Sequence, residues 1–179
     1  MKIKVNGPIW IDEFSYKDIE PLTKYLNDEE VYLSTLNIPH PYTSIDAREW
    51  IDFTKFETRE LYFPRNFAIR LGEQMIGGIG YSKKDSPVYE HQAEIGYWLA
   101  REFWNRGYMT DTVAAMVKWL FAEQNFIKLT ANVFDFNFAS VQVLLKNGFK
   151  EEGLLRKHIK KDNVYYDCRA FGLLKEEQL

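Results

Sequence analysis

The chain has 179 residues and a formal net charge of −3, with 46% hydrophobic and 27% charged residues. This composition is typical of a folded domain with a buried core and excludes a disordered chain. The acidic balance argues against nucleic acid as the main partner, because phosphate binding needs a cationic surface. The length predicts a single domain over residues 1–179.

Cysteine usage and apolar runs bear on the compartment. Cys168 is the only cysteine, which excludes an internal disulfide and fits a reducing environment. No apolar stretch approaches the ~18 residues that a membrane-spanning helix needs, and the N-terminal residues do not resemble a signal peptide. We therefore expect a cytoplasmic protein without a membrane partner, and the sequence leaves monomer and homodimer open.

Hydrophobic periodicity and helix-capping residues predict a mixed α/β chain. Ser15 with Asp18 forms a capping pattern for one early helix, and Ser44 is predicted to cap another. In chain order we expect a strand at 9–14, helices at 15–27, 28–36 and 44–57, strands at 66–71, 75–81 and 92–99, a helix at 107–124, a strand at 128–134, a helix at 137–147, and strands at 149–160 and 164–174. The turn between the last two strands is expected at Asp162-Asn163. Consecutive strands in the middle favour a mixed sheet over a doubly wound parallel one.

The segment W-N-R-G-Y-M, Trp104 to Met109, lies between a predicted strand and a predicted helix. The first turn of a helix has N–H groups without intrahelical partners, and the helix dipole is positive there. Gly107 allows an anion to approach the backbone, Asn105 tolerates unusual backbone angles, and Arg106 adds positive charge. These features favour a diphosphate site. The alternative is an ordinary loop before a helix.

A second motif follows in N-F-A-S-V-Q-V-L-L-K-N-G-F, residues 137–149. Asn137 by itself is a favoured helix N-cap, and Gly148 by itself is an ordinary glycine at a helix C-terminus. Together, the two segments resemble the GNAT acetyltransferases. The first is similar to that family's acetyl-CoA motif Q/R-x-x-G-x-G/A, and the second to its N-x-x-S/A-x(5)-K-x-G-F element.

The resemblance is closest to the branch that contains the ribosomal-protein N-terminal acetyltransferases, where tryptophan commonly takes the first motif position, here Trp104. Two positions depart from the pattern: Met109 replaces the usual small residue, and Asn105 replaces a glycine common in this branch. The resemblance implies acetyl-CoA as co-substrate, no metal, and a mostly antiparallel sheet flanked by helices. That sheet is splayed between two parallel strands, those expected at 92–99 and 128–134. It implies cofactor contacts from Trp98, Leu99, Trp104, Asn105, Arg106, Gly107, Tyr108, Met109, Thr110, Asn137 and Lys146.

Catalysis of amine acetylation needs a proton acceptor for the amine and a proton for the leaving thiolate. Glu94 is the one carboxylate on the strand at 92–99, so it is the candidate base, acting directly or through water. The alternative is a surface or salt-bridged glutamate. In many relatives the general acid is a tyrosine at the position where this chain has Leu144. The candidate acid here is therefore Ser140. Ser140 could instead help to cap its helix. Other hydroxyls that remain open as the acid belong to Tyr42, Tyr81 and Tyr97.

The acceptor is an amine, and three hypotheses remain open. The first is a protein N-terminal α-amine, the second a small amine such as a polyamine, an amino sugar or a toxic amine, and the third a CoA-binding module without catalysis. The acidic run Asp28 to Glu30 would suit a polyamine. Tyr42, in a loop stiffened by Pro39 and Pro41, is a candidate acceptor contact. It could also simply pack on the helix that follows.

Other motifs carry weaker signals. Gly77-Gly78-Ile79-Gly80 does not have the G-x-G-x-x-G spacing of a nucleotide loop, so we interpret it as a strand with a close backbone neighbour. The three histidines are scattered without the spacing of a metal site. Cys168 lies in a predicted strand with nothing nearby to activate it, so we do not expect a nucleophile.

Overall fold

The computed structural model describes residues 1–178. Contacts divide the chain into two compact units. Unit 1 comprises Met1–Gly80 and Tyr97–Tyr108, and unit 2 comprises Tyr81–Gly96 and Met109–Leu179. Each unit therefore combines two stretches of the chain that are distant in sequence.

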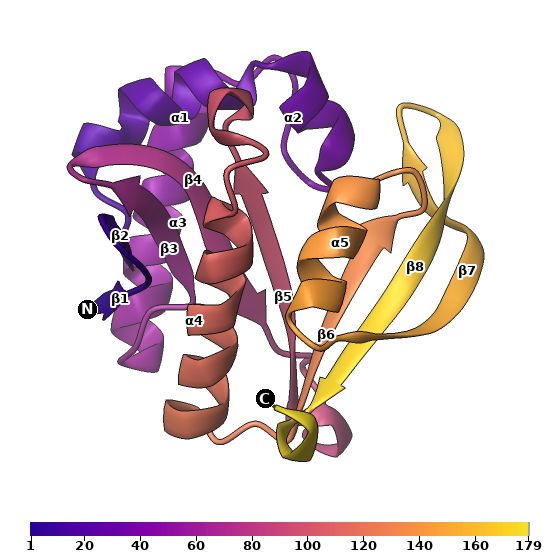
Figure 1. Cartoon of the computed structure of the whole chain (residues 1–179). Coiled ribbons are helices and arrows are strands. Elements are labelled where there is room, and N and C mark those ends of the chain that lie inside the picture. Colours follow the sequence, from indigo (N-terminus) through magenta and orange to yellow (C-terminus); the bar gives the residue numbers. More distant parts are fainter. Residues whose placement is uncertain (179) are drawn as a thin grey trace. The chain divides into compact units, whose positions relative to one another are not determined.

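Four strands of unit 1 form an antiparallel meander, seen in Figure 1: β1 (Lys2–Lys4), β2 (Ile9–Glu13), β3 (Asn66–Leu71) and β4 (Gln74–Ser82), which ends just beyond the unit. Ile11, Phe67 and Ile69 are fully buried in it. The strand β1 was absent from the predicted elements. Its three residues are Lys-Ile-Lys, too short and too polar to show a hydrophobic period.

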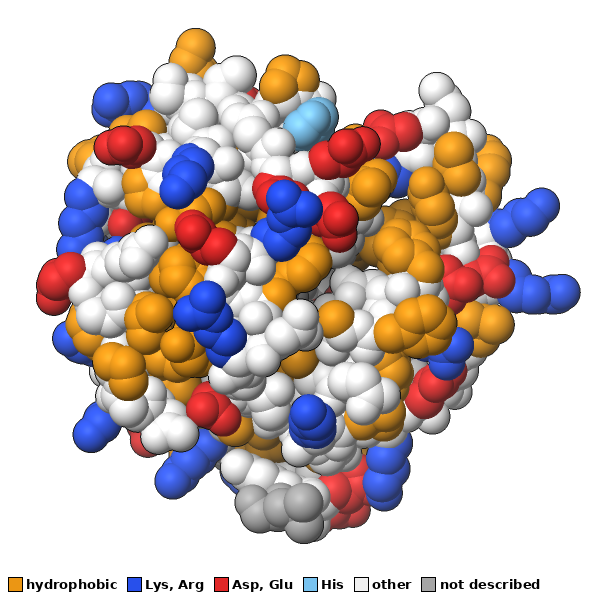
Figure 2. Space-filling model, turned by 45° about the horizontal axis from the view of Figure 1, so that its top comes forward, with side chains coloured by type: hydrophobic (Ala, Val, Ile, Leu, Met, Phe, Trp, Pro, Cys, Tyr) orange, Lys and Arg blue, Asp and Glu red, His pale blue; other side chains and the backbone are white. Residues whose placement is uncertain are grey.

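The predicted capping pattern at the first helix is confirmed. Ser15 and Asp18 form a capping box that opens a short 3-10 helix, η1 (Tyr16–Asp18), which continues as α1 (Ile19–Leu26). The next helix, α2 (Glu29–Ser34), is capped by Asp28, whose side chain accepts a hydrogen bond from the Glu30 backbone. Acidic and basic side chains are interspersed on the surface of the α1 and α2 end, which is turned toward the viewer in Figure 2.

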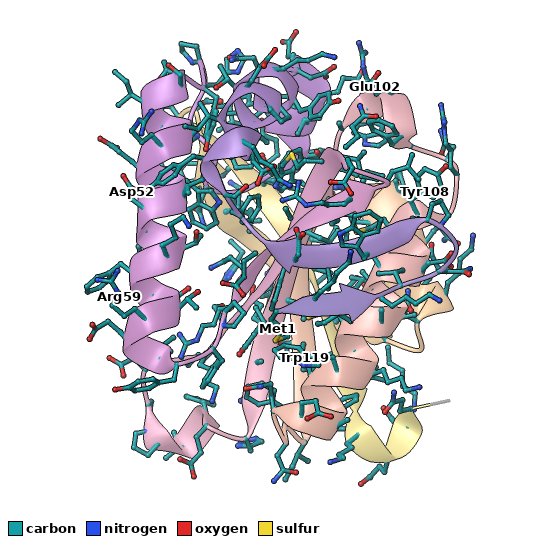
Figure 3. The ribbon with its side chains drawn as sticks, turned by 90° about the vertical axis from the view of Figure 1, so that its left-hand side faces the viewer. Met1, Asp52, Arg59, Glu102, Tyr108 and Trp119 are labelled. Carbon is teal, nitrogen blue, oxygen red and sulfur yellow. The ribbon has the colours of Figure 1, made fainter. Side chains whose placement is uncertain are left out.

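The prediction that Ser44 caps the third helix is wrong. The N-cap is Thr43, and α3 runs over Ser44–Leu61, beyond the predicted end at residue 57. The Thr43 hydroxyl accepts from the Asp46 N–H at 3.2 Å, and the Asp46 carboxylate accepts from the Thr43 N–H at 2.7 Å. Ser44 would have Ala47 at the corresponding position, and alanine cannot return the second bond. Asp52 and Arg59 point away from the sheet on the outer face of α3 (Figure 3).

A buried ion network joins three elements of unit 1. Arg70 on β3 is 1% exposed and donates to both carboxylate oxygens of Asp18, at 2.8 and 3.0 Å, and to Asp12 on β2. Burial by itself would raise the pKa of Asp18, but hydrogen bonds from Arg70 and Ser15 outweigh burial, so that pKa lies below its ordinary value. The network therefore depends on an ionised Asp18.

Unit 2 contains α4 (Tyr108–Glu123), β6 (Lys128–Phe134), α5 (Phe138–Lys146), β7 (Lys150–Lys161) and β8 (Val164–Leu174). Tyr108, the first residue of α4, still belongs to unit 1. β8 pairs antiparallel with β6 and with β7, and β7 and β8 form the long hairpin at the yellow end of Figure 1. Asp162 and Asn163 join them with positive φ values of 50° and 63°, as expected of the hairpin turn predicted there. Short 3-10 helices η2 (Pro87–Tyr89) and η4 (Lys175–Glu177) also lie in this unit.

The strand β5 (Gln92–Leu99) begins in unit 2 and ends in unit 1, followed by η3 (Arg101–Phe103). It pairs with β6 in parallel at three positions, Gln92–Glu94 with Lys128–Thr130. The strand order is β1-β2-β3-β4-β5-β6-β8-β7. The predicted mixed α/β fold, with a mostly antiparallel sheet and one parallel pair between 92–99 and 128–134, is confirmed. No helix within residues 1–178 combines the length and the apolar character needed to cross a bilayer.

Candidate active site

The loop that follows β5 is tied to the end of that strand. The indole Nε1–H of Trp104 donates to the backbone carbonyl of Leu99 at 2.7 Å. After this anchor, Asn105 and Gly107 both adopt the left-handed region, with φ of 60° and 79°. A Cβ at Gly107 would meet no atom within 4 Å, so the space beside its backbone is open. The loop therefore leads into α4 with an exposed, unusually shaped backbone.

Side chains around this loop have different exposures. Arg106 is exposed, donates to the Glu102 carbonyl at 3.0 Å and lies 5.9 Å from the centre of the Phe103 ring. Tyr108 is half-buried. In unit 2, Met109 is 8% exposed and Thr110 is half-buried, with its carbonyl accepting from Asn147 at 3.2 Å. Burial of Met109 accounts for a large apolar residue where the family motif has a small one.

The glycines of β4 are required by a close neighbour, as predicted. A Cβ at Gly77 would lie 2.4 Å from the carbonyl oxygen of Trp98, and one at Gly78 would lie 2.7 Å from the Trp98 indole nitrogen. Trp98 is half-buried and Leu99 is 8% exposed. The Gly-rich stretch is thus part of the packing of β4 against the end of β5.

In unit 2, Glu94 has a partner that the sequence analysis did not identify. The Asn132 side-chain amide on β6 donates to Glu94 Oε1 at 3.1 Å, and both residues are half-buried. The thiol of Cys168 on β8 lies 3.8 Å from Asn132 Oδ1. Burial raises the pKa of the Cys168 thiol, which agrees with the expectation of an inert cysteine. In the sequence, the one signal for this partner was the polar residue Asn132 between two apolar residues, Ala131 and Val133, which are buried in the structure.

The residues of the second motif occupy the ends of α5. Asn137 is the N-cap, and its Oδ1 accepts from the Ser140 N–H at 3.1 Å. Ser140 is half-buried in the first turn, and Lys146 is exposed in the last. Gly148 has φ of 81° just after the helix, as expected of a C-terminal glycine. The capping interpretations of Asn137 and Gly148 are therefore confirmed.

Tyr42 in unit 1 is 6% exposed. Its backbone N–H donates to Asn27 Oδ1 at 2.9 Å, and its carbonyl accepts from the same side chain. Burial, together with the nearby Asp46 carboxylate, raises the pKa of the Tyr42 hydroxyl to about 12. This burial favours the packing interpretation of Tyr42. Of the other tyrosines, Tyr81 is 4% exposed with its hydroxyl 3.5 Å from Gln124.

The acidic run at α2 has a basic partner within unit 1. The guanidinium of Arg101 forms two ion pairs, with Nε 2.9 Å from Asp28 Oδ2 and Nη1 3.7 Å from Glu30 Oε1. A shallow pocket of about 310 Å³ is lined there by Lys24, Tyr25, Asp28, Arg101 and Glu102. Two of the three carboxylates of the run thus share one guanidinium, and the charge of the run is partly compensated. Among residues 1–178, no group of three or more His, Cys, Asp or Glu side chains could hold a metal ion.

Comparisons with known proteins place the chain in a family. Residues 9–150 match the acetyltransferase (GNAT) domain. The uncharacterized N-acetyltransferase YnaD of Bacillus subtilis is 30% identical over 168 residues, 93% of this chain and 94% of that protein.

Solved structures of acetyltransferases have the same fold as this chain. A GNAT-family acetyltransferase from Bacillus anthracis is 27% identical with a TM-score of 0.85, covering 99% of this chain and 100% of that one. RimL, the ribosomal L7/L12 α-N-protein acetyltransferase in complex with coenzyme A, is 17% identical with a TM-score of 0.85, covering 97% of this chain and 98% of that one; this likeness shows the fold. The chain belongs to the GNAT acetyltransferase family and is an acetyl-CoA-dependent N-acetyltransferase.

Proposed function

We propose that this enzyme acetylates the α-amine of a protein N-terminus, in the manner of the ribosomal-protein N-terminal acetyltransferases. The observation that carries the proposal is at the acidic run of α2: Asp28 and Glu30 share the cation Arg101, which lessens the negative charge that would favour a polyamine. The tryptophan at the first motif position, Trp104, and the fold shared with RimL also support it. A small amine is the alternative acceptor.

For the cofactor, the loop at 104–107 and the start of α4 are the proposed diphosphate site. The residues present fit an anion: two left-handed positions, Asn105 and Gly107, open space beside Gly107, and the start of a helix immediately after. Arg106 adds charge, and Trp98, Leu99, Tyr108, Met109, Thr110, Asn137 and Lys146 complete the proposed acetyl-CoA contacts. Backbone groups at Trp98 and Leu99 are the proposed contacts for the pantetheine arm and the developing oxyanion.

The proposed chemistry is direct attack. Glu94, directly or through water, takes a proton from the substrate ammonium and leaves a neutral amine. The nitrogen forms a bond to the thioester carbonyl carbon, the carbon–sulfur bond breaks, and the nitrogen loses its second proton to water. The thiolate of CoA takes up a proton, which Ser140 supplies in this proposal and recovers from water. The balance is one ammonium and one acetyl-CoA giving one amide, one CoA thiol and one proton released.

The test is an acetyl-CoA turnover assay against paired acceptors. The two peptides of each pair have the same sequence with an internal lysine, and they differ only in whether the N-terminal α-amine is free or blocked. Polyamines and amino sugars are assayed separately. We expect turnover with the free α-amine peptides and little with the blocked ones. Turnover confined to polyamines or amino sugars would show the alternative acceptor, and equal rates with free and blocked peptides would contradict α-amine specificity.

A further inference from the structure

Asn132 and Glu94 form a directed hydrogen bond across two strands of unit 2. Asn132 Nδ2 donates to Glu94 Oε1 at 3.1 Å, from β6 to β5. Among the residues that the structure describes, the Glu94 carboxylate makes no other hydrogen bond or ion pair. One carboxylate oxygen is therefore held by an amide, and the other, Oε2, has no partner among these residues.

A second neighbour lies at the other end of the Asn132 amide. The Cys168 thiol on β8 lies 3.8 Å from Asn132 Oδ1 and 3.7 Å from the Arg169 carbonyl oxygen, its alternative acceptor. Burial raises the pKa of that thiol, with smaller contributions from the Glu94 and Asp135 charges, so it stays a protonated donor. A flipped amide would turn its carbonyl oxygen toward the Glu94 carboxylate and repel it. The Glu94 carboxylate thus favours the orientation in which Asn132 donates to it, and the thiol beside Oδ1 is compatible with that orientation.

We propose that Asn132 is a positioning residue that fixes the Glu94 carboxylate and presents Oε2 as the proton acceptor. This inference rests on the proposed role of Glu94 as the base. A carboxylate on a flexible side chain samples several orientations, and a hydrogen bond to one oxygen reduces them. A base must lie within hydrogen-bond reach of the proton it accepts, so holding its orientation raises the rate of proton transfer.

The experiment compares Asn132→Ala, Glu94→Gln and the double variant, measuring kcat, both KM values and CoA affinity by calorimetry. We expect Asn132→Ala to lower kcat by about 10- to 100-fold, the range for a hydrogen bond to a charged group, with KM for acetyl-CoA unchanged. In the Glu94→Gln background the same substitution should cause little further loss, because Asn132 acts through Glu94.

Two further variants separate positioning from packing. Asn132→Asp keeps the size of the side chain but replaces the donor with a like charge, so its loss should be at least as large as that of Asn132→Ala. Thr130→Val changes a half-buried residue of the same strand whose hydroxyl contacts the Ala93 carbonyl at 3.4 Å and not Glu94, and it should keep near-normal kcat. Thermal unfolding checks that each variant is folded.

The outcomes distinguish this inference from the role of Glu94 itself. If Glu94→Gln loses turnover but Asn132→Ala and Asn132→Asp keep it, the base stands and the inference is wrong. If Asn132→Ala lowers kcat by the same factor with and without Glu94, Asn132 acts independently and the inference is also wrong. If Glu94→Gln keeps normal turnover, the proposed base is wrong and the role of Asn132 falls with it.

Discussion

The indole of Trp104 donates a 2.7 Å hydrogen bond to the carbonyl of Leu99, the last residue of β5. This bond holds the start of the W-N-R-G-Y-M loop against the end of the strand that precedes it. The loop then passes through Asn105 and Gly107, two positions in the left-handed region. A tryptophan at the first motif position thus has a structural reason: it supplies a donor that a purely apolar ring would lack.

Trp104→Phe should weaken CoA binding by a few-fold and lower stability by about 1 to 3 kcal/mol, because the Leu99 carbonyl loses its donor while the ring volume is largely kept. Calorimetry with CoA and thermal unfolding measure the two effects. Trp50→Phe, which changes a half-buried indole on α3, is the matched control and should leave CoA affinity unchanged. Equal CoA affinity in Trp104→Phe and wild type would contradict the anchoring role.

Gly107→Asp should weaken CoA binding by more than tenfold, that is by more than about 1.4 kcal/mol, because it places a negative charge beside the proposed diphosphate site. Gly107→Asn is the control, since asparagine has the same size and tolerates the left-handed angle of 79° without the charge. It should weaken binding clearly less. A folded Gly107→Asp protein with normal CoA affinity would show that the diphosphate lies elsewhere.

Glu94→Gln should keep CoA affinity but lower turnover by about 10²- to 10⁴-fold at neutral pH, the range for loss of a general base. The deficit should shrink as pH rises, because a peptide α-amine with pKa ~7.7–8.0 is then already neutral. A pH profile of kcat/KM for the amine measures this. Near-normal turnover at pH 7 would move the base to another group or to water.

Ser140→Ala tests the proposed acid against a capping role. It should lower turnover with little change in the acidic limb of the pH profile, because Ser140 donates a proton to the thiolate and does not accept one from the amine. The cap itself should survive, since Asn137 bonds the backbone N–H of Ser140 and not its hydroxyl. Unchanged turnover would return the acid role to one of the tyrosines or to water.

Asp18→Asn should destabilise the protein by about 3 to 5 kcal/mol, because it leaves the buried Arg70 without its main charged partner. The pKa of Asp18 is lowered in the folded chain, so its contribution is full above the unfolded pKa of ~3.9 and is lost as pH falls through the lower folded value. Thermal unfolding from pH 7 down to pH 2 measures this.

The control for that measurement is Asp12→Asn, which removes the more exposed partner of Arg70. The side chain of Asp12 is 27% exposed, against 1% for Asp18, so its loss should cost less. Equal destabilisation by the two variants, or a wild-type acid transition unchanged in Asp18→Asn, would contradict the assignment of acid sensitivity to Asp18.

Tyr42→Phe and Tyr42→Ala separate packing from contact with the acceptor. Because the ring is buried, Tyr42→Ala should lower stability by about 3 to 5 kcal/mol. Tyr42→Phe keeps the ring, so it should keep both stability and KM for the amine. If Tyr42→Phe instead raises KM for the amine and leaves KM for acetyl-CoA unchanged, the hydroxyl contacts the acceptor, as the loop position first suggested.

Much of the fold was predictable from the sequence because its signals are local. The hairpin turn at Asp162-Asn163, the capping box at Ser15 and Asp18, and the N-cap Asn137 depend on residues close together in the chain. The exchange of Ser44 for Thr43 as a cap is an error of one residue, and the Asp46 that decides it was visible in the sequence. The two motifs together predicted the family.

By itself, then, the sequence determined the order of the α-helices and of the strands from residue 9 onward, the family and the loop proposed for acetyl-CoA, since each is encoded in a short run of residues. The tertiary structure decided which side chains meet across strands. Three contacts join residues that are distant in the sequence: the bond from Asn132 to Glu94, the buried pair of Arg70 with Asp18, and the close approach of the Trp98 carbonyl to Gly77. Such contacts depend on strand register and on the twist of the sheet, which no local pattern specifies.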